Sequence, residues 1–181
     1  MAQITYQGKP VHTCGELPLV GRPCPPFTLT RSDLRPLTLV DLEGKRAVLN
    51  IFPSLDTAIC AKGVYTFDAR AEEASDMTVV CVSMDLPFAQ RRFAAEHDID
   101  HAVLASTFRN QEFGEAFGVT MVDGPLQGLL ARAVVALDEN GTVVHTELVP
   151  ELACEATYDW ALDLIHQHHH PCPEDALLTS E

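Results

Sequence analysis

The stretch Ala47-Val-Leu-Asn-Ile-Phe-Pro-Ser-Leu-Asp-Thr-Ala-Ile-Cys60 contains the two signals that decide the fold. Its first part, residues 47–52, is a short apolar run with β-branched side chains, which predicts a buried strand. Pro53 ends this strand because proline has no N–H to donate to a neighbouring strand. Asp56 or Thr57 can then cap a helix, since a side-chain oxygen there accepts a bond from an N–H two or three residues later. The stretch therefore predicts a strand, a turn and the start of a helix.

The predicted helix carries a cysteine in its first turn. Apolar residues continue at helical spacing along it: Cys60, Val64, Phe67 and Ala71. Unpaired N–H groups and the helix dipole at this end favour an anion, so the sequence predicts that Cys60 is readily a thiolate, the reactive form of cysteine. The alternative interpretation, a small buried hydrophobe, explains neither the helix start nor the spacing of Pro53, Thr57 and Cys60.

The composition restricts the class of protein. With 181 residues, 46% of them hydrophobic, the chain fits one globular domain. A formal net charge of −14 argues against nucleic acid and anionic membrane surfaces as partners, because both require a basic footprint. No apolar run approaches the length of a membrane span, and the N-terminus lacks a signal-peptide pattern, so we expect a cytoplasmic protein. In that reducing compartment most of the six cysteines should be free thiols.

The order of the other predicted elements indicates an α/β protein with a mixed sheet. Alternating residues on both sides of Gln7-Gly8 predict an N-terminal β-hairpin. A second buried strand over 78–83 makes a βαβ unit with the first, so these two strands should be parallel. Further strands are predicted over 27–30, 103–106, 131–137 and 142–149, a short helical or turn segment over 39–42, and helices over 88–97, 111–117 and 158–166. This order fits a thioredoxin-like fold with helices on both faces of the central sheet. We expect a domain over residues 1–165, followed by a mobile tail over 166–181.

The spacing Pro53-x-x-x-Thr57-x-x-Cys60 resembles the peroxidatic loop of the peroxiredoxins. Four further segments narrow the resemblance to the bacterial thiol peroxidases: Asp85-Leu-Pro-Phe-Ala-Gln90, Ser106-Thr-Phe-Arg-Asn110, Asp123-Gly-Pro-Leu126 and Ala131-Arg-Ala133. The resemblance runs from about residue 4 to about residue 164. It implies a thioredoxin-like homodimeric enzyme that reduces hydrogen peroxide and organic hydroperoxides. The alternatives are a peroxide-sensing or thiol-disulfide exchange protein of the same fold with little turnover; the absence of a Cys-x-x-Cys motif counts against exchange.

The residues of the expected site have separate roles. Cys60 supplies the sulfur, and Thr57, one helical turn earlier, can hold the thiolate and a peroxide oxygen with its hydroxyl. Pro53 would shape and dry the pocket, and backbone N–H groups near Cys60 would act as in an oxyanion site. The resemblance places Arg132 beside Cys60, whereas without it a surface salt bridge would be the preferred interpretation of this arginine. The chemistry requires no metal and no organic cofactor, and the resemblance implies thioredoxin or another thiol as the electron donor.

The chain departs from the family pattern in the helix after Pro87. The family motif matches Phe88-Ala-Gln-Arg-Arg-Phe93, but the position of the resolving cysteine is occupied by Ala94. Either this is a natural variant or the cysteine was replaced. We therefore expect oxidised Cys60 to stall as the sulfenic acid, with Cys154 and Cys172 as weaker substitutes for the resolving thiol. The histidines around 166–170 are interpreted as part of a solvated tail rather than as a metal site.

Overall fold

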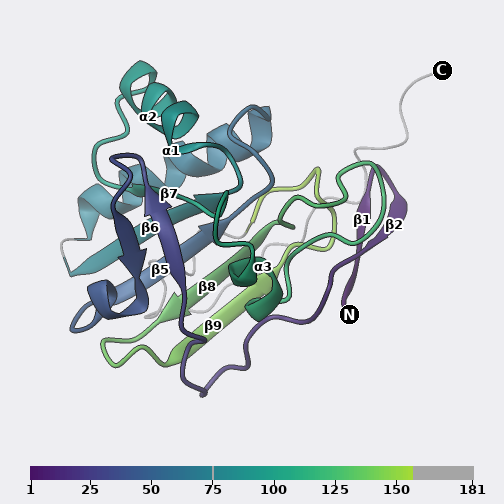
Figure 1. Ribbon diagram of the computed structural model, residues 1–181, viewed down its shortest axis with the longest axis horizontal. Coiled ribbons are helices and arrows are strands. Elements are labelled where there is room, and N and C mark those ends of the chain that lie inside the picture. The colour runs from purple at the N-terminus through teal and green to yellow at the C-terminus, as the bar shows by residue number, and fades with distance from the viewer. Residues whose placement is uncertain (75, 157–181) are drawn as a thin grey trace.

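The computed structural model describes residues 1–74 and 76–156, and it contains a seven-stranded mixed sheet (Figure 1). The strand order is β4-β3-β7-β6-β5-β8-β9. The bounds are β3 Thr28–Arg31, β4 Pro36–Thr38, β5 Arg46–Ile51, β6 Met77–Ser83, β7 Val103–Ser106, β8 Ala133–Leu137 and β9 Val143–Leu148. The predicted helix over 158–166 and the predicted tail lie outside the described residues.

The two central strands confirm the predicted βαβ unit. Strand β5 pairs with β6 in parallel, with Val48 opposite Val79 and Ile51 opposite Val82. On its other side β5 pairs antiparallel with β8. Five of the six residues of β5 are buried, as expected for a strand covered on both faces. The arrangement places the carboxyl end of β5 and the beginning of β8 at the same edge of the sheet.

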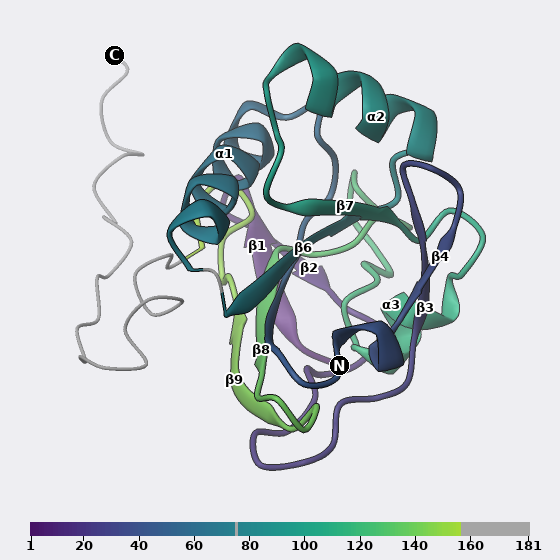
Figure 2. The same ribbon diagram turned by 90° about the vertical axis from the view of Figure 1, so that its left-hand side faces the viewer.

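Helices cover both faces of the sheet, as predicted (Figure 2). On one face, α1 (Ala58–Glu73) and α2 (Pro87–Glu96) pack Phe67 and Phe93 into a core cluster that also contains Cys60. On the other face, α3 (Glu112–Ala116) and the 3₁₀ helix η1 (Leu39–Leu42) pack against the remaining core. Among the described residues, no helix is long and apolar enough to cross a membrane.

The predicted N-terminal hairpin is present but stands apart from the main sheet. It consists of β1 (Gln3–Tyr6) and β2 (Lys9–His12), with Gln7 and Gly8 both at positive φ in the turn. Its first strand bonds to the chain just after β9: Thr5 N–H donates to the Pro150 carbonyl at 2.7 Å. Leu152 N–H donates back to the Thr5 carbonyl at 2.9 Å. The hairpin thus holds the segment that follows the last strand.

Strand β8 begins two residues later than the sequence predicts. Ala131 N–H donates to the Val119 carbonyl at 2.7 Å, outside the sheet, so the ladder with β5 starts only at Ala133. Arg132 therefore precedes the strand instead of lying within it. It therefore lies at the edge of the sheet where β5 ends.

Candidate active site

The loop between β5 and α1 is fixed by Asp85, which follows β6. The Asp85 carboxylate accepts hydrogen bonds from Leu55 N–H, the Ser54 hydroxyl and the Ser83 hydroxyl, each at 2.8 Å. Helix α2 starts at Pro87, so Asp85 lies before it and braces this loop. The sequence does contain a signal for this role of Asp85. The residue follows a buried strand that is parallel to β5, and the carboxyl ends of parallel strands lie at the same edge of the sheet.

Cys60 is the third residue of α1 and is 1% exposed. The first helical bond runs from Ala61 N–H to the Thr57 carbonyl at 3.0 Å, so the N–H groups of residues 58–60 precede it. Thr57 is the N-cap residue, but its side chain makes no capping bond. Its hydroxyl donates instead to the Ser54 carbonyl at 3.2 Å, which corrects the prediction of a Thr57 cap on Cys60. The helix start therefore retains N–H donors that suit an anion.

The structure brings Arg132 and Cys60 together. Arg132 is 3% exposed, and its Nη2 donates to Cys60 Sγ at 3.3 Å and to the Leu152 carbonyl at 3.3 Å. Within the described residues, Arg132 Nε is buried without a hydrogen-bond partner. A buried unpaired donor costs about 1–3 kcal/mol, so an oxygen acceptor that reached it would gain that interaction. The sulfur, the guanidinium and the N-terminus of the helix together suit the binding of a small molecule with oxygen acceptors.

Glu151 fixes the carbonyl that orients Arg132. Its carboxylate accepts hydrogen bonds from four donors: Thr5 Oγ1, Gln7 N, Gly8 N and Ala153 N. Burial by itself would raise the pKa of Glu151, but these hydrogen bonds outweigh it and lower the pKa. Neither Glu151 nor Leu152 is predicted from the sequence, because neither lies in a motif and both act through contacts with distant parts of the chain.

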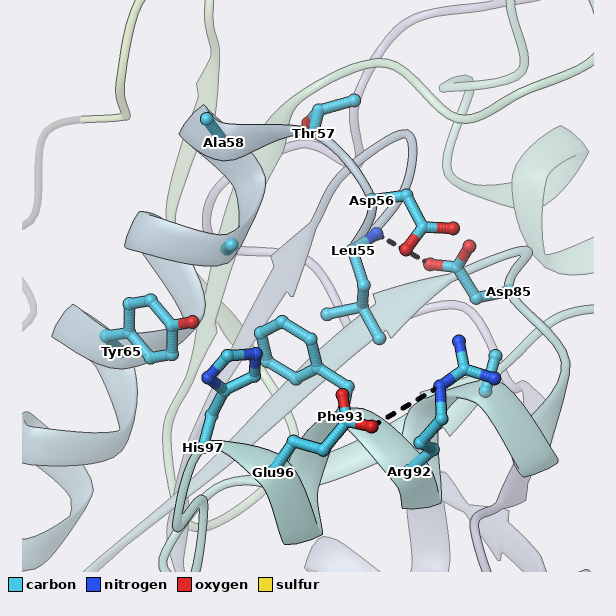
Figure 3. Close-up of a pocket in the computed structure, with 12 residues that line it drawn as sticks. Leu55, Asp56, Thr57, Ala58, Tyr65, Asp85, Arg92, Phe93, Glu96 and His97 are labelled. Carbon is cyan, nitrogen blue, oxygen red and sulfur yellow. Dashed lines mark hydrogen bonds and ion pairs between the residues drawn. The ribbon is translucent and has the colours of Figure 1, made fainter.

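A cavity of about 360 Å³ opens between α1 and α2 beside the first turn of α1 (Figure 3). Thr57 and Ala58 line it, whereas the Cys60 side chain does not. Tyr65 stacks on Phe93 with ring centroids 5.8 Å apart, and His97 lies against both rings. In Figure 3 these rings gather at one end of the cavity, while Asp56 and Asp85 lie at the other.

The remaining cysteines differ sharply in their surroundings. Burial raises the pKa of Cys24 and of Cys81 to about 12, and the Cys81 sulfur accepts a bond from Asn50 at 3.5 Å. Cys14 is half-buried and donates to the Gly114 carbonyl at 3.4 Å. These three and Cys60 are free thiols, whereas Cys154 is disulfide-bonded.

The positions linked to the expected resolving step lie in the same region. Ala94 on α2 and Cys154 after β9 both pack, half-buried, against the core cluster that contains Cys60. Cys172 lies outside the described residues. Pro53 is buried in the loop before Thr57. Among the described residues, no group of histidine, cysteine, aspartate and glutamate side chains is arranged to hold a metal ion.

Known proteins share both the sequence and the fold. The Redoxin family model matches residues 19–162. The thiol peroxidases of Mycobacterium bovis and Mycobacterium tuberculosis are each 54% identical to this chain over 162 residues, which is 90% of this chain and 97% of theirs.

Two solved structures extend the comparison. A peroxiredoxin-like protein from Aquifex aeolicus superposes with a TM-score of 0.85 at 33% identity, covering 91% of this chain and 95% of that one. A thiol peroxidase from Chromobacterium violaceum superposes with a TM-score of 0.81 at 20% identity, covering 90% and 94%. At that lower identity the likeness concerns the fold alone.

Proposed function

Since this chain belongs to the Redoxin family and is a thiol peroxidase of the peroxiredoxin type, we propose that Cys60 is its peroxidatic cysteine and that Arg132, Thr57 and Pro53 complete the catalytic site. A thiol-dependent peroxidase needs a thiolate, a polarised O–O bond and stabilisation of the charge that leaves on the second oxygen. The observation that carries the assignment is the 3.3 Å contact between Arg132 Nη2 and Cys60 Sγ in a buried site.

The reaction at Cys60 is a displacement on oxygen. The thiolate attacks one peroxide oxygen, an S–O bond forms, and the O–O bond breaks. The electron pair of that bond leaves with the second oxygen, which takes a proton and departs as water or an alcohol. The sulfur, now a sulfenic acid, has been oxidised by two electrons.

Arg132 serves both partners in this step. Its Nη2 stabilises the thiolate before attack, and the unpartnered Nε offers a donor to a peroxide oxygen. The guanidinium is planar and permanently charged, so both groups are held at a fixed mutual geometry. The N–H groups of residues 58–60 supply further donors to the charge that develops on the leaving oxygen.

Thr57 and Pro53 shape the approach to the sulfur. Thr57 lines the cavity one helical turn before Cys60, and rotation of its hydroxyl away from the Ser54 carbonyl would bring it to a bound peroxide. Pro53 is buried at the base of the loop, and it has no N–H that could donate a hydrogen bond to water. The proposed substrates are hydrogen peroxide and organic hydroperoxides.

The electrons return through a thiol reductant, as the family requires. We infer that this reductant is thioredoxin or a low-molecular-weight thiol. We further infer that the protein is a cytoplasmic homodimer and that its catalytic domain spans residues 1–165. The support is the family resemblance and the charge of −14, which argues against attachment to nucleic acid or anionic membranes. Light scattering of the purified protein tests the dimer directly.

A sensor or exchange protein with little turnover is the less favoured function. The similarity to thiol peroxidases covers nearly the full length of those enzymes, and the described thiols do not include a Cys-x-x-Cys pair. Turnover with excess thiol reductant distinguishes an enzyme from a sensor, which would oxidise once and stop.

The central test compares two variants, in each of which one cysteine is replaced by serine. Cys60→Ser should abolish peroxide consumption, measured in the presence of excess dithiothreitol. Cys14→Ser is the matched control, since Cys14 is a free, half-buried thiol that a serine can replace as a donor to Gly114. Substantial consumption by Cys60→Ser, with Cys14→Ser inactive, would reverse the assignment.

A further inference from the structure

We propose that a second cavity, beside α3, binds a small aliphatic disulfide with amino groups, and that Cys14 in its wall captures half of this molecule as a mixed disulfide. The cavity has a volume of about 380 Å³, which is within the range of small-molecule sites. It shares no lining residue with the cavity beside α1, so the two cavities are separate.

The second cavity lies at the carboxyl ends of two parallel strands. Met84 directly follows β6 and Thr107 directly follows β7, and these two strands pair in parallel. The remaining walls include residues of α3 and Cys14, which comes just after the N-terminal hairpin. In open α/β sheets, ligands bind at the edge where the carboxyl ends of the strands lie. The cavity is therefore at a position that suits a ligand.

A buried hydroxyl in the cavity wall lacks a partner. Thr107 is 1% exposed, and its hydroxyl oxygen has no hydrogen-bond partner among the described residues. Its backbone, in contrast, is bonded on both sides. The Thr107 N–H donates to the Ser83 carbonyl and the Thr107 carbonyl accepts from Asn110 N–H, each at 2.9 Å. Because an unpaired buried hydroxyl costs free energy, a ligand whose N–H donated to this oxygen would gain affinity.

Cys14 is fixed in the cavity wall as a free thiol. Its N–H donates to the Thr120 carbonyl at 2.8 Å, and its sulfur donates to the Gly114 carbonyl at 3.4 Å. Cys14 is half-buried, whereas the other three free thiols of the described residues are buried. A disulfide in this cavity would thus meet a thiol that is both held in place and within reach.

The lining favours a ligand with a positive charge and a short apolar body. Exposed Glu115 brings a negative charge, and the described lining contains no positive side chain. Met84, Val122 and Leu130 add apolar surface. An aliphatic disulfide with amino groups matches both features. Its methylene groups and sulfurs would pack on the apolar wall, while an ammonium group would donate to Thr107 or pair with Glu115.

The exchange step balances with the disulfide as its co-reactant. The Cys14 thiolate attacks one sulfur of the disulfide, a new S–S bond forms, and the old S–S bond breaks. The electron pair of the old bond leaves with the departing thiolate, which takes up the proton that Cys14 lost. A small thiol that reduces the peroxidase is released as such a disulfide. This source of the reactant rests on the proposed function, whereas the site itself does not.

The test measures how fast Cys14 of the full chain reacts with cystamine, an aliphatic disulfide with two amino groups. The protein is reduced, freed of reductant and treated without peroxide, and peptide mapping follows the mixed disulfide at Cys14. Binding before reaction predicts a rate that saturates as the cystamine concentration rises. Dithiodipropionate, a disulfide with two carboxylates, should react more slowly by about two- to fivefold, the effect expected of an exposed charge.

A first variant removes the hydroxyl and keeps the shape of the side chain. Thr107→Val should slow the reaction of Cys14 with cystamine by about two- to tenfold, the effect of one hydrogen bond. Its reaction with iodoacetamide, which measures the accessibility of the thiol alone, should not change. Since the hydroxyl has no partner among the described residues, the midpoint of urea unfolding should not fall.

A second variant removes the charge at the cavity. Glu115→Gln should bring the rates with cystamine and dithiodipropionate closer together. Glu112→Gln is the matched control, because Glu112 is exposed on the same helix but does not line the cavity, and it should retain the preference for cystamine.

Three results would overturn the proposal. They are a rate at Cys14 that stays linear in cystamine concentration, equal cystamine rates in Thr107→Val and the full chain, and a preference for cystamine that Glu115→Gln leaves unchanged. Peroxide consumption with dithiothreitol, measured on the same preparations, tests Cys60 independently. An active peroxidase with a linear cystamine rate would thus refute the site alone.

Discussion

At the scale of single residues, the guanidinium of Arg132 links the sulfur of Cys60 to the backbone carbonyl of Leu152. Two of its nitrogens differ in their contacts. Nη2 donates to Cys60 and to Leu152, whereas Nε has no hydrogen-bond partner among the described residues. Lysine could not reproduce this geometry, because its ammonium is a single point charge on a flexible stem.

Replacement of Arg132 should therefore strongly reduce the rate at which peroxide oxidises Cys60. Its effect on the stability of the fold should be much smaller. We expect Arg132→Met to reduce the rate of Cys60 oxidation by about 10²–10³, the usual effect of removing one donor from an oxyanion site. Stopped-flow measurement with hydrogen peroxide gives this rate. Arg46→Met is the matched control, because Arg46 pairs with Asp76 at the opposite end of β5. Equal rates in both variants would show that the Arg132 contact has no catalytic role.

The burial of Cys24 and Cys81 leads to a second prediction, which concerns their reactivity. Because burial raises the pKa of Cys24 and Cys81 to about 12 from an ordinary 9.0, both remain protonated in the folded protein at neutral pH. Iodoacetamide should therefore leave them unmodified between neutral pH and pH ~9 and label them rapidly once urea unfolds the chain. Peptide mapping reads the sites. Native labelling of Cys81 as fast as that of Cys14 would contradict the burial argument.

Cys24 and Cys81 also determine how the free energy of unfolding changes at alkaline pH. Unfolded thiols lose their protons near the ordinary value, whereas the folded ones retain theirs until about pH 12. The folded state then binds more protons than the unfolded state, so the free energy of unfolding falls as the pH rises above about 9.

At the scale of elements, the decisive contact joins the N-terminal hairpin to the end of β9. Glu151 receives hydrogen bonds from both the turn of the hairpin and its own segment, and the next residue supplies the carbonyl that orients Arg132. The hairpin is therefore part of the support of the site, although it does not belong to the main sheet.

Glu151→Gln should weaken this support in a pH-dependent way. The lowered pKa means that the stabilising effect of Glu151 is present above its ordinary value of 4.5 and is lost as the pH falls through the folded pKa. We expect a loss of ~1 kcal/mol in unfolding free energy at neutral pH, measured by urea unfolding, and a smaller difference from the parent protein in acid. The exposed Glu139→Gln is the control and should show no such convergence.

The elements themselves were largely predictable, and the contacts between them were not. Continuous β-branched runs mark β5 and β6, and Asn140-Gly141 marks the turn between β8 and β9, because each signal is local. The start of β8 was misplaced because the Val119 carbonyl, distant in sequence, takes the Ala131 N–H.

In the candidate site, too, some features could be predicted from the sequence and others could not. The cysteine at the start of α1 follows from helical spacing alone, and the resemblance implied its arginine. The helix cap predicted for the Thr57 hydroxyl is absent, because this hydroxyl donates to the Ser54 carbonyl within the loop. The bond from Arg132 to Leu152 carries no local signal, since it depends on the hairpin holding a turn without regular structure.

At the scale of the whole molecule, the net charge of −14 governs encounters with other macromolecules. An acidic protein reductant should react faster as ionic strength rises from ~0.01 M to ~0.15 M, because the Debye length falls from ~30 Å to ~8 Å and screens the repulsion. Steady-state turnover at several salt concentrations measures this. An uncharged small dithiol is the control and should show no such increase. A decrease with the acidic reductant would indicate a local basic docking surface instead.

The bridge from Cys60 through Arg132 to Leu152 also has a consequence for biosynthesis. The ribosome makes Cys60 in the first third of the chain, but the arginine that contacts it comes 72 residues later and the Leu152 carbonyl 20 residues after that. A nascent chain that exposes the predicted helix start thus carries a cysteine without its charged partner. Its full reactivity arises only when residues 132–152 have left the exit tunnel and docked on the waiting N-terminal hairpin. With the proposed role of Cys60, prematurely terminated products would contain a thiol without its charged partner, and the peroxide chemistry would be confined to nearly finished molecules.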